Sequence, residues 1–309
     1  MMGTMADSCE YLVTGAGGGI GSVSRSVTEL LIREGATVRA MVHREDDRAE
    51  ALRVLGAQVV VGDLTDPEDV VTVMRGVRRM FLNMSVSADY LTATAIVCAA
   101  GQAEPELETL VNMSQMTVSQ MTLTSRSESN QHRLHWLAEH IIDWSGLPVT
   151  HVRPTVFLDN PLFTFLNADS VRDRHALVLP FGEGRTSPIA PIDVARVVAT
   201  LLTTAPDGHE HVYELTGPEV LDIGGLAQSY SRALQHEIAG VDIAYDDWLE
   251  NVLKPVGLPP HVEQHIATMA RLHRADRYDR LTDDVERLTG APPLTAEQYI
   301  AAHPDRFGG

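Results

Sequence analysis

A glycine-rich segment near the N-terminus constrains the fold of this chain more than any other feature. The run Tyr11-Leu12-Val13-Thr14 leads directly into Gly15-Ala16-Gly17-Gly18-Gly19-Ile20-Gly21, after which a helical pattern begins. Gly15, Gly18 and Gly21 follow the spacing G-x-x-G-x-x-G. Such a loop allows a tight turn after a strand and close packing of the next helix on that strand. The segment therefore predicts a strand, a tight turn and a helix in succession.

The same loop predicts a dinucleotide site. Glycines leave the backbone open to a pyrophosphate, and the N-terminus of the following helix offers free N–H groups and a positive dipole end. We therefore expect cofactor contacts from Gly15, Gly17, Gly18, Gly19, Ile20 and Gly21. An ordinary glycine-rich turn is the alternative. The flanking strand and helix favour the dinucleotide interpretation, because the motif requires both.

Short β-branched runs alternate with longer segments of helical periodicity from residue 11 to about 155. This alternation is typical of a parallel sheet. Strands are expected at 11–14, 37–42, 58–61, 79–82, 109–113 and 148–152, and helices at 20–34, 47–55, 67–75, 87–101 and 130–145. The pattern predicts an α/β fold, a doubly wound parallel Rossmann sheet with helices on both faces.

The pattern loosens after Pro154. Residues 155–188 contain several prolines and predict loops, and a helix at 191–204 and a strand at 211–216 follow. Further helices are expected at 222–236, 246–254, 260–274 and 295–302. We therefore expect a dinucleotide-binding Rossmann domain over 1–155 and a smaller, mostly helical substrate-binding cap over 156–309, with 191–216 returning to the Rossmann core.

Charge and residue usage exclude several classes of protein. The 24 basic and 42 acidic residues give a net charge of −18, which argues against nucleic acid and anionic membranes as partners and favours a small molecule. Lys254 is the only lysine, so a P-loop and a Schiff-base lysine before it are excluded. Two cysteines are too few for a disulfide scaffold. No signal peptide is visible, and we expect a cytoplasmic protein.

The end of the second predicted strand bears on the choice of cofactor. An acidic residue there suits the ribose 2′-hydroxyl of NAD, whereas arginine suits the 2′-phosphate of NADP. This strand ends in His43 and Arg44, and no acid appears before Glu45. The sequence therefore favours NADP(H) and leaves NAD(H) open. The alternative is that Arg44 is a solvated loop residue.

Residues that follow the later strands complete the predicted cofactor site. Asp63 could face the adenine ring or cap the helix that starts near Asp66. Asn83 could serve the geometry of its loop or contact a cofactor amide, and Ser114 could contact ribose or substrate. The remaining predicted cofactor contacts are Leu64, Met84 and Pro154.

Several segments carry a family resemblance along nearly the whole chain. They are Leu12-Val13-Thr14-Gly15 with the glycine loop, the second strand, Gly56 to Leu64, Ser145-Gly146-Leu147-Pro148, Val152-Arg153-Pro154, Pro191-Ile192-Asp193-Val194-Ala195 and Leu288 to Pro293. Together they resemble the NmrA-like family of atypical short-chain dehydrogenase/reductases. That family includes quinone reductases, azoreductase-like proteins and redox-sensing regulators. The resemblance implies NAD(P) binding and either reductase or regulatory function.

The chain departs from the broader superfamily in its chemistry. Typical members use a Tyr-x-x-x-Lys pair, which is absent here because no tyrosine lies between Tyr90 and Tyr213 and the only lysine is Lys254. NmrA-like relatives often lack the pair too. The resemblance places His135 where relatives carry His or Lys. The His135 imidazole could donate a proton to the substrate or only position the cofactor.

Two functions remain open from the sequence. The first is an NAD(P)H-dependent reductase of a quinone or another electron-poor aromatic ketone, which accepts hydride without strong acid assistance. Its substrate contacts would be Trp136, Phe157, Asn160 and Phe163. The second is a non-catalytic redox sensor, in which the aromatic side chains fill the pocket and the protein signals the redox state through a partner protein. A homodimer is also open, and no metal site is expected.

Overall fold

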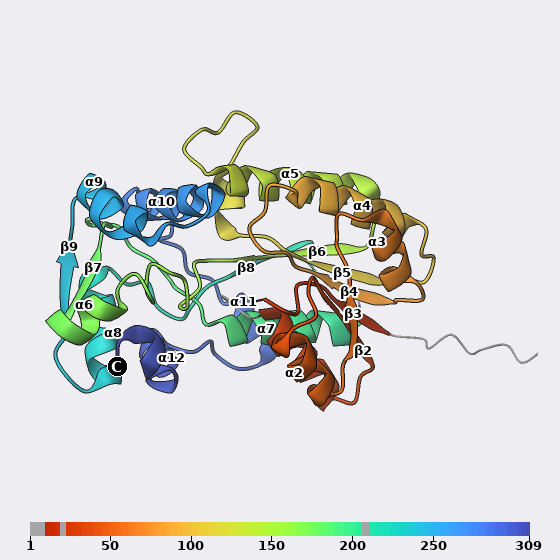
Figure 1. The fold of residues 1–309 in the computed structure, drawn as a ribbon, viewed down its shortest axis with the longest axis horizontal. Helices are drawn as coiled ribbons and strands as arrows, with labels where there is room; N and C mark the ends of the chain where they lie inside the picture. Colours follow the sequence, from red (N-terminus) through yellow and green to blue (C-terminus); the bar gives the residue numbers. More distant parts are fainter. Residues whose placement is uncertain (1–9, 19–22, 206–209) are drawn as a thin grey trace, which may run out of the picture. The chain divides into compact units, whose positions relative to one another are not determined.

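A parallel sheet of seven strands is the central element of the computed structural model, which describes residues 10–18, 23–205 and 210–309. Its strands are β1 (Tyr11–Val13), β2 (Val38–Val42), β3 (Gln58–Val61), β4 (Arg79–Leu82), β5 (Thr109–Met113), β6 (Val149–Pro154) and β8 (Val212–Leu215). Their order is β3-β2-β1-β4-β5-β6-β8 (Figure 1). The first six strands have the Rossmann order. The predicted doubly wound parallel sheet is therefore confirmed.

Burial on both faces explains why these short apolar runs form strands. Leu12 of β1 pairs with Arg39 of β2 on one side and with Met80 of β4 on the other, and its side chain is fully buried. All five residues of β5 are buried as well. Strands covered by helices on both faces are mostly apolar rather than alternating, and apolar residues predominate in the strands here.

Helices cover both faces of the sheet. They are α1 (Val23–Arg33), α2 (Asp47–Leu55), α3 (Pro67–Met74), α4 (Tyr90–Gln102), α5 (Asn130–Ser145) and α7 (Pro191–Thr203). Helices α3, α4 and α5 lie along one face, and α2 and α7 lie on the other (Figure 1). Asp46 and Asp66 start α2 and α3, because each side chain accepts hydrogen bonds from two N–H groups of the first turn.

The remaining elements are mostly helical. They are η1 (Met116–Gln120), α6 (Ala168–Arg174), β7 (Ala176–Leu179), α8 (Ile223–Leu234), β9 (Ala239–Asp242), α9 (Tyr245–Trp248), η2 (Leu249–Leu253), η3 (Lys254–Val256), α10 (Pro260–Arg274), α11 (Asp284–Thr289), α12 (Ala296–Ala302) and η4 (Pro304–Phe307). No helix in the described part of the chain is both long and apolar enough to cross a bilayer.

The stretch 155–188, expected to be rich in loops, also contains regular elements that the sequence pattern did not predict. Helix α6 and strand β7 lie within this stretch, and β7 pairs in parallel with β9 in a second sheet of two strands. Strand β7 has four residues and gains its partner from a segment far along the chain. Local sequence pattern does not reveal such a pairing, because strand propensity depends strongly on tertiary context.

The described chain divides into two compact units. The first contains residues 10–114, 134–152 and 195–213, and the second contains residues 115–133, 153–194 and 214–309, apart from the residues outside the described ranges. In the first unit, Val73 of α3, Val97 of α4 and Ile142 of α5 belong to one apolar cluster with Leu12 and Leu110 of the sheet. Each unit therefore has a core of its own.

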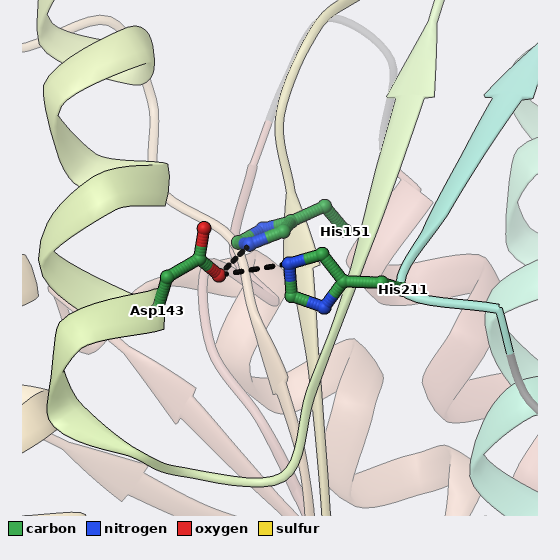
Figure 2. Close-up of side chains that lie close together, drawn as sticks. All are labelled: Asp143, His151 and His211. Carbon is green, nitrogen blue, oxygen red and sulfur yellow. Dashed lines mark hydrogen bonds and ion pairs between the residues drawn. The ribbon is translucent and has the colours of Figure 1, made fainter.

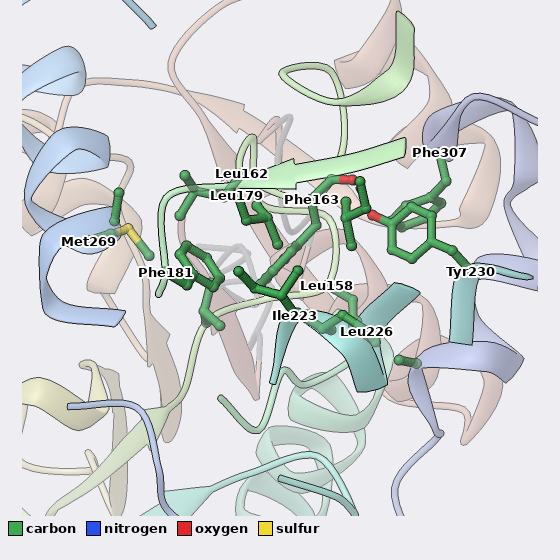
Figure 3. Packing of buried hydrophobic residues seen from close by; sticks show 14 of the residues in the cluster. Leu158, Leu162, Phe163, Leu179, Phe181, Ile223, Leu226, Tyr230, Met269 and Phe307 are labelled. Carbon is green, nitrogen blue, oxygen red and sulfur yellow. Dashed lines mark hydrogen bonds between the residues drawn. The ribbon is translucent and has the colours of Figure 1, made fainter. Parts of the chain in front are cut away.

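The core of the second unit is rich in aromatic side chains. Phe163, Phe181 and Phe307 are almost completely buried in one cluster with Leu158 and Tyr230 (Figure 3). The phenol of Tyr230 donates a hydrogen bond to the carbonyl oxygen of Phe163. Each fully buried side chain of this size contributes roughly 1.5–3 kcal/mol through removal of apolar surface from water.

Candidate dinucleotide site

A cavity of about 380 Å³ lies in the first unit, at the carboxyl ends of β1, β2, β3 and β4. It is lined by Gly15, Met41, Val42, His43, Gly62, Asp63, Leu64, Thr65, Asn83, Met84, Ser85, Ser87 and Asp89. Because the carboxyl ends of parallel strands meet at one edge of a sheet, four separate sequence segments converge here. Ligands bind at this edge in open α/β sheets.

Gly15 makes the turn between β1 and the rest of the loop. Its φ is +66°, and a Cβ placed on it would lie 2.8 Å from the carbonyl oxygen of Asn83. Both the backbone conformation and the close approach therefore require glycine. The N–H of Gly18 donates to the Gly15 carbonyl oxygen at 3.0 Å, and a Cβ placed on Gly17 would lie 3.5 Å from the Val42 side chain, an ordinary contact distance. The predicted contacts Gly19, Ile20 and Gly21 lie outside the described residues.

Asn83 anchors the loop through three hydrogen bonds. The hydroxyl of Thr14 donates to the Asn83 carbonyl oxygen at 2.8 Å, and the Asn83 N–H donates back to the Thr14 hydroxyl oxygen at 2.9 Å. The Asn83 side-chain amide donates to the hydroxyl of Ser24 at 2.9 Å. Asn83 thus serves loop geometry, one of its two expected roles. The sequence pattern did not point to Thr14 and Ser24, although Thr14 directly precedes the first glycine.

Arg44 follows β2 and is exposed. Two nearby arginines already have acidic partners, since Arg48 pairs with Asp46 and Arg53 pairs with Glu45. Among the residues that the structure describes, no acid forms an ion pair with Arg44. Its guanidinium group is therefore available to an anion. His43, which precedes it, lines the cavity.

Asp63 presents an ionised carboxylate to the same cavity. One of its oxygens accepts hydrogen bonds from the backbone N–H and the hydroxyl of Thr65, both at 2.8 Å. These hydrogen bonds lower the pKa of the Asp63 carboxyl, with a smaller contribution from His43. The other oxygen lies 3.9 Å from Nδ1 of His43. Helix α3 is capped by Asp66 and not by Asp63, so the capping alternative for Asp63 is corrected.

His135 connects to the carboxyl end of β5 through Tyr90. The two rings lie 4.4 Å apart between centroids, and the Tyr90 phenol donates to the carbonyl oxygen of Met113 at 3.2 Å. Burial raises the pKa of Tyr90 far above its usual value, so this phenol is neutral and not a tyrosinate base. Ser114, which follows Met113 at the end of β5, is 4% exposed, and its hydroxyl has no hydrogen-bond partner among the described atoms.

The predicted substrate residues lie in different surroundings. Trp136 is half-buried on α5, and its ring packs on His140 at 4.0 Å between centroids. Phe157 is half-buried in the second unit and forms a parallel bridge with Ile189. The side-chain oxygen of Asn160 accepts from the Leu162 N–H at 3.0 Å, so this oxygen fixes a turn.

Phe163 and Pro154 are both buried residues of the second unit. The ring of Phe163 is 1% exposed and meets Phe181 edge to face, at 6.2 Å between centroids. It is a core residue in this structure, and we leave it out of the substrate contacts proposed below. Pro154 ends β6.

The strand order, the glycine loop and the cavity define a dinucleotide-binding protein of the Rossmann class. The chain belongs to the NAD(P)H-binding family, whose model matches residues 15–205. It is 26% identical to an NAD(P)H azoreductase of Xenophilus azovorans, over 94% of this chain and 98% of that protein. It is 29% identical to the (4-alkanoyl-5-oxo-2,5-dihydrofuran-3-yl)methyl phosphate reductase of Streptomyces griseus subsp. griseus, over 96% and 98% of the two chains.

Several solved structures of similar fold contain a bound dinucleotide. An NADPH-dependent quinone oxidoreductase from Escherichia coli, complexed with NADPH, has a TM-score of 0.80 at 21% identity and covers 94% of this chain and 99% of its own. NmrA, a negative transcriptional regulator in complex with NADP, has a TM-score of 0.79 at 17% identity and covers 96% and 95%. The fold expected from the NmrA-like resemblance is therefore confirmed.

Proposed function

We propose that this protein is an NAD(P)H-dependent reductase that transfers hydride to a quinone-like compound or another electron-poor aromatic ketone. The observation that carries the proposal is the cavity at the carboxyl ends of β1 to β4, with the glycine turn at one side and the exposed Arg44 beyond β2. Membership of the NAD(P)H-binding family and the reductase activity named for both curated relatives support it.

The residues of the cavity fit a dinucleotide, and they favour NADP(H). Gly15 and Gly17 keep side chains away from the turn, where a pyrophosphate would approach the backbone. The Asp63 carboxylate is an acceptor suited to the adenosine end. The Arg44 guanidinium offers donors for a 2′-phosphate, which only NADP(H) carries.

The bound dinucleotide would supply the hydride, and the chain itself offers little acid catalysis. Tyr90 is neutral, and its hydroxyl already donates a hydrogen bond to the Met113 carbonyl oxygen. An electron-poor aromatic acceptor spreads the incoming charge over its ring, so it takes its proton from water. On this proposal His135 holds the cofactor in position rather than donating a proton. Trp136, which belongs to the same unit as the cavity, stays a proposed contact for a flat aromatic substrate.

The test is to follow NADPH absorbance with a panel of quinones, azo dyes and simple aliphatic ketones. We expect turnover of the quinones or dyes and none of the aliphatic ketones, because only the former accept hydride without an acid. Cofactor affinity is measured in parallel by fluorescence. Tight NADPH binding without turnover of any compound would contradict the reductase proposal and favour the redox sensor.

A further inference from the structure

Three side chains with metal-ligating atoms meet at the amino ends of β5, β6 and β8, at the edge of the sheet opposite the dinucleotide cavity. They are Asp143 near the end of α5, His151 in β6 and His211 just before β8 (Figure 2). All three belong to the first unit. One ligand atom from each lies within 4.8 Å of the other two.

The geometry of the cluster is close to that of a metal centre. One carboxylate oxygen of Asp143 lies 2.9 Å from Nε2 of His151 and 3.0 Å from Nε2 of His211. Both rings direct this nitrogen at the carboxylate (Figure 2). Ligands about 2.0–2.1 Å from a tetrahedral zinc ion stand about 3.3 Å apart. A cation could therefore replace the shared protons once the two imidazole nitrogens and the carboxylate oxygen adjust to this spacing.

The surroundings of His151 supply a second, independent observation. Its side chain is 1% exposed, and its Nδ1 lies 2.9 Å from the side-chain nitrogen of Asn112. The side-chain oxygen of Asn112 is buried without a hydrogen-bond partner among the described atoms. Rotation of the amide exchanges these two atoms. The oxygen then accepts the Nδ1–H of His151, which leaves the Nε2 lone pair facing Asp143, the arrangement that orients metal-binding histidines.

A cavity of about 520 Å³ adjoins the cluster. Asp143 and His211 line it together with Thr109, Thr150 and Glu210. A cation held by the three side chains would thus have a coordination position open to water or a small ligand. Two imidazoles and one carboxylate form a donor set typical of open zinc sites, and the absence of a thiolate from this set argues against a soft monovalent ion.

We propose that the first unit binds one divalent cation of the zinc class through Asp143, His151 and His211, with an open position toward this cavity. The dinucleotide site lies at the carboxyl ends of β1 to β4, whereas this site lies at the amino ends of β5, β6 and β8. Metal binding and NADPH binding are therefore separable. The proposal does not depend on the reductase function.

The experiment is a calorimetric titration of the full, untagged and chelator-treated protein with Zn²⁺. We expect one ion per chain, and at least tenfold weaker binding after His211→Ala, because one of three ligands is removed. His261→Ala is the matched control, since His261 is an exposed histidine of α10. The His261→Ala protein should bind Zn²⁺ with the same affinity as the unmodified protein. Titration with Co²⁺ should give visible d–d absorption, which should be reduced in His211→Ala and unchanged in His261→Ala.

Asp143→Asn is the second variant and guards against misfolding. It preserves side-chain size, and its thermal midpoint without metal and its NADPH affinity are measured beside the titration. Weaker Zn²⁺ binding in a folded Asp143→Asn protein supports the site. Absence of stoichiometric binding to the unmodified protein, or equal affinity in His211→Ala and His261→Ala, would overturn it.

Discussion

Thr14 and Asn83 exchange two hydrogen bonds, one in each direction, between the ends of β1 and β4. The Thr14 residue is completely buried, so its end of both bonds is shielded from water. They hold the Asn83 carbonyl oxygen against Gly15, where a Cβ would lie 2.8 Å from it. The start of the glycine loop is thereby fixed before any ligand arrives.

Gly15→Ala tests this contact. The left-handed region costs alanine about 1–2 kcal/mol, and its methyl group would also press on the Asn83 carbonyl oxygen. We expect a lower thermal midpoint and weaker NADPH binding. Gly35→Ala is the matched control, because Gly35 has a φ of +85° and a Cβ placed on it would meet nothing within 4 Å. Equal losses in both variants would show that the Asn83 contact has no effect.

Arg44→Ala should weaken NADPH much more than NADH. A charge-assisted hydrogen bond of this kind contributes about 1.5–3 kcal/mol, which corresponds to roughly 10- to 150-fold in affinity. Dissociation constants for both cofactors by fluorescence titration measure the effect. Arg53→Ala is the control, since Arg53 is paired with Glu45. The preference for NADP(H) fails if Arg44→Ala affects both cofactors alike.

His135→Ala separates positioning from proton transfer. If the imidazole positions the cofactor, the dissociation constant for NADPH rises and kcat stays independent of pH near neutrality. An imidazole that acts as general acid would instead make kcat fall as pH rises through its pKa. Stopped-flow and steady-state rates between acid and alkaline pH provide the comparison. A pH dependence of kcat that disappears in His135→Ala, with NADPH affinity unchanged, would identify a general acid.

His273 makes the protein less stable in acid. Its ring is stacked between Phe181 and Tyr278, at 4.1 and 4.0 Å, and burial lowers its pKa to about 3. Below the unfolded pKa of about 6.5 the unfolded chain binds the additional proton. The free energy of unfolding therefore falls by about 1.4 kcal/mol per pH unit as pH drops from about 6.5 toward 3. Above pH 6.5 this contribution is constant.

Urea denaturation of His273→Phe over this pH range measures the effect. Phenylalanine retains the stacking and loses the hydrogen bond from Nδ1 to the Met269 carbonyl oxygen, so stability at neutral pH falls. Its dependence on acid pH should nevertheless be shallower than that of the unmodified protein. His261→Gln, at an exposed position, should leave the slope unchanged. If the free energy of unfolding depends on pH equally in all three proteins, the acid sensitivity does not come from His273.

The central sheet could be predicted well from the sequence. Strands β3, β4 and β5 have the predicted bounds, because buried parallel strands are short β-branched runs that helix-period segments separate. The turn at Gly15 was predictable for the same kind of reason, since its residue type and its place after a strand both follow from backbone geometry. Both features leave a recognisable pattern in the local sequence, although the sheet itself forms by pairing of distant strands.

Features that depend on distant residues were not predictable. Strand β9 contains Ala239 and Gly240 and is exposed throughout, so neither propensity nor apolar pattern indicates it. Phe163 is of a residue type that could line an aromatic pocket, but it packs in the core. Only the tertiary structure distinguishes these two positions. The cluster of Asp143, His151 and His211 comes from three elements, and no spacing motif joins them.

The first unit is assembled from three stretches that are separate in the sequence, and this affects its folding during biosynthesis. Strand β8 begins at Val212, so the ribosome must deliver most of the chain before β6 acquires its second neighbour beside β5. Until then the nascent protein carries β6 as an open sheet edge, which is a template for pairing with other chains. Ribosome stalling or premature termination ahead of β8 would therefore release an aggregation-prone product rather than a working half of the molecule.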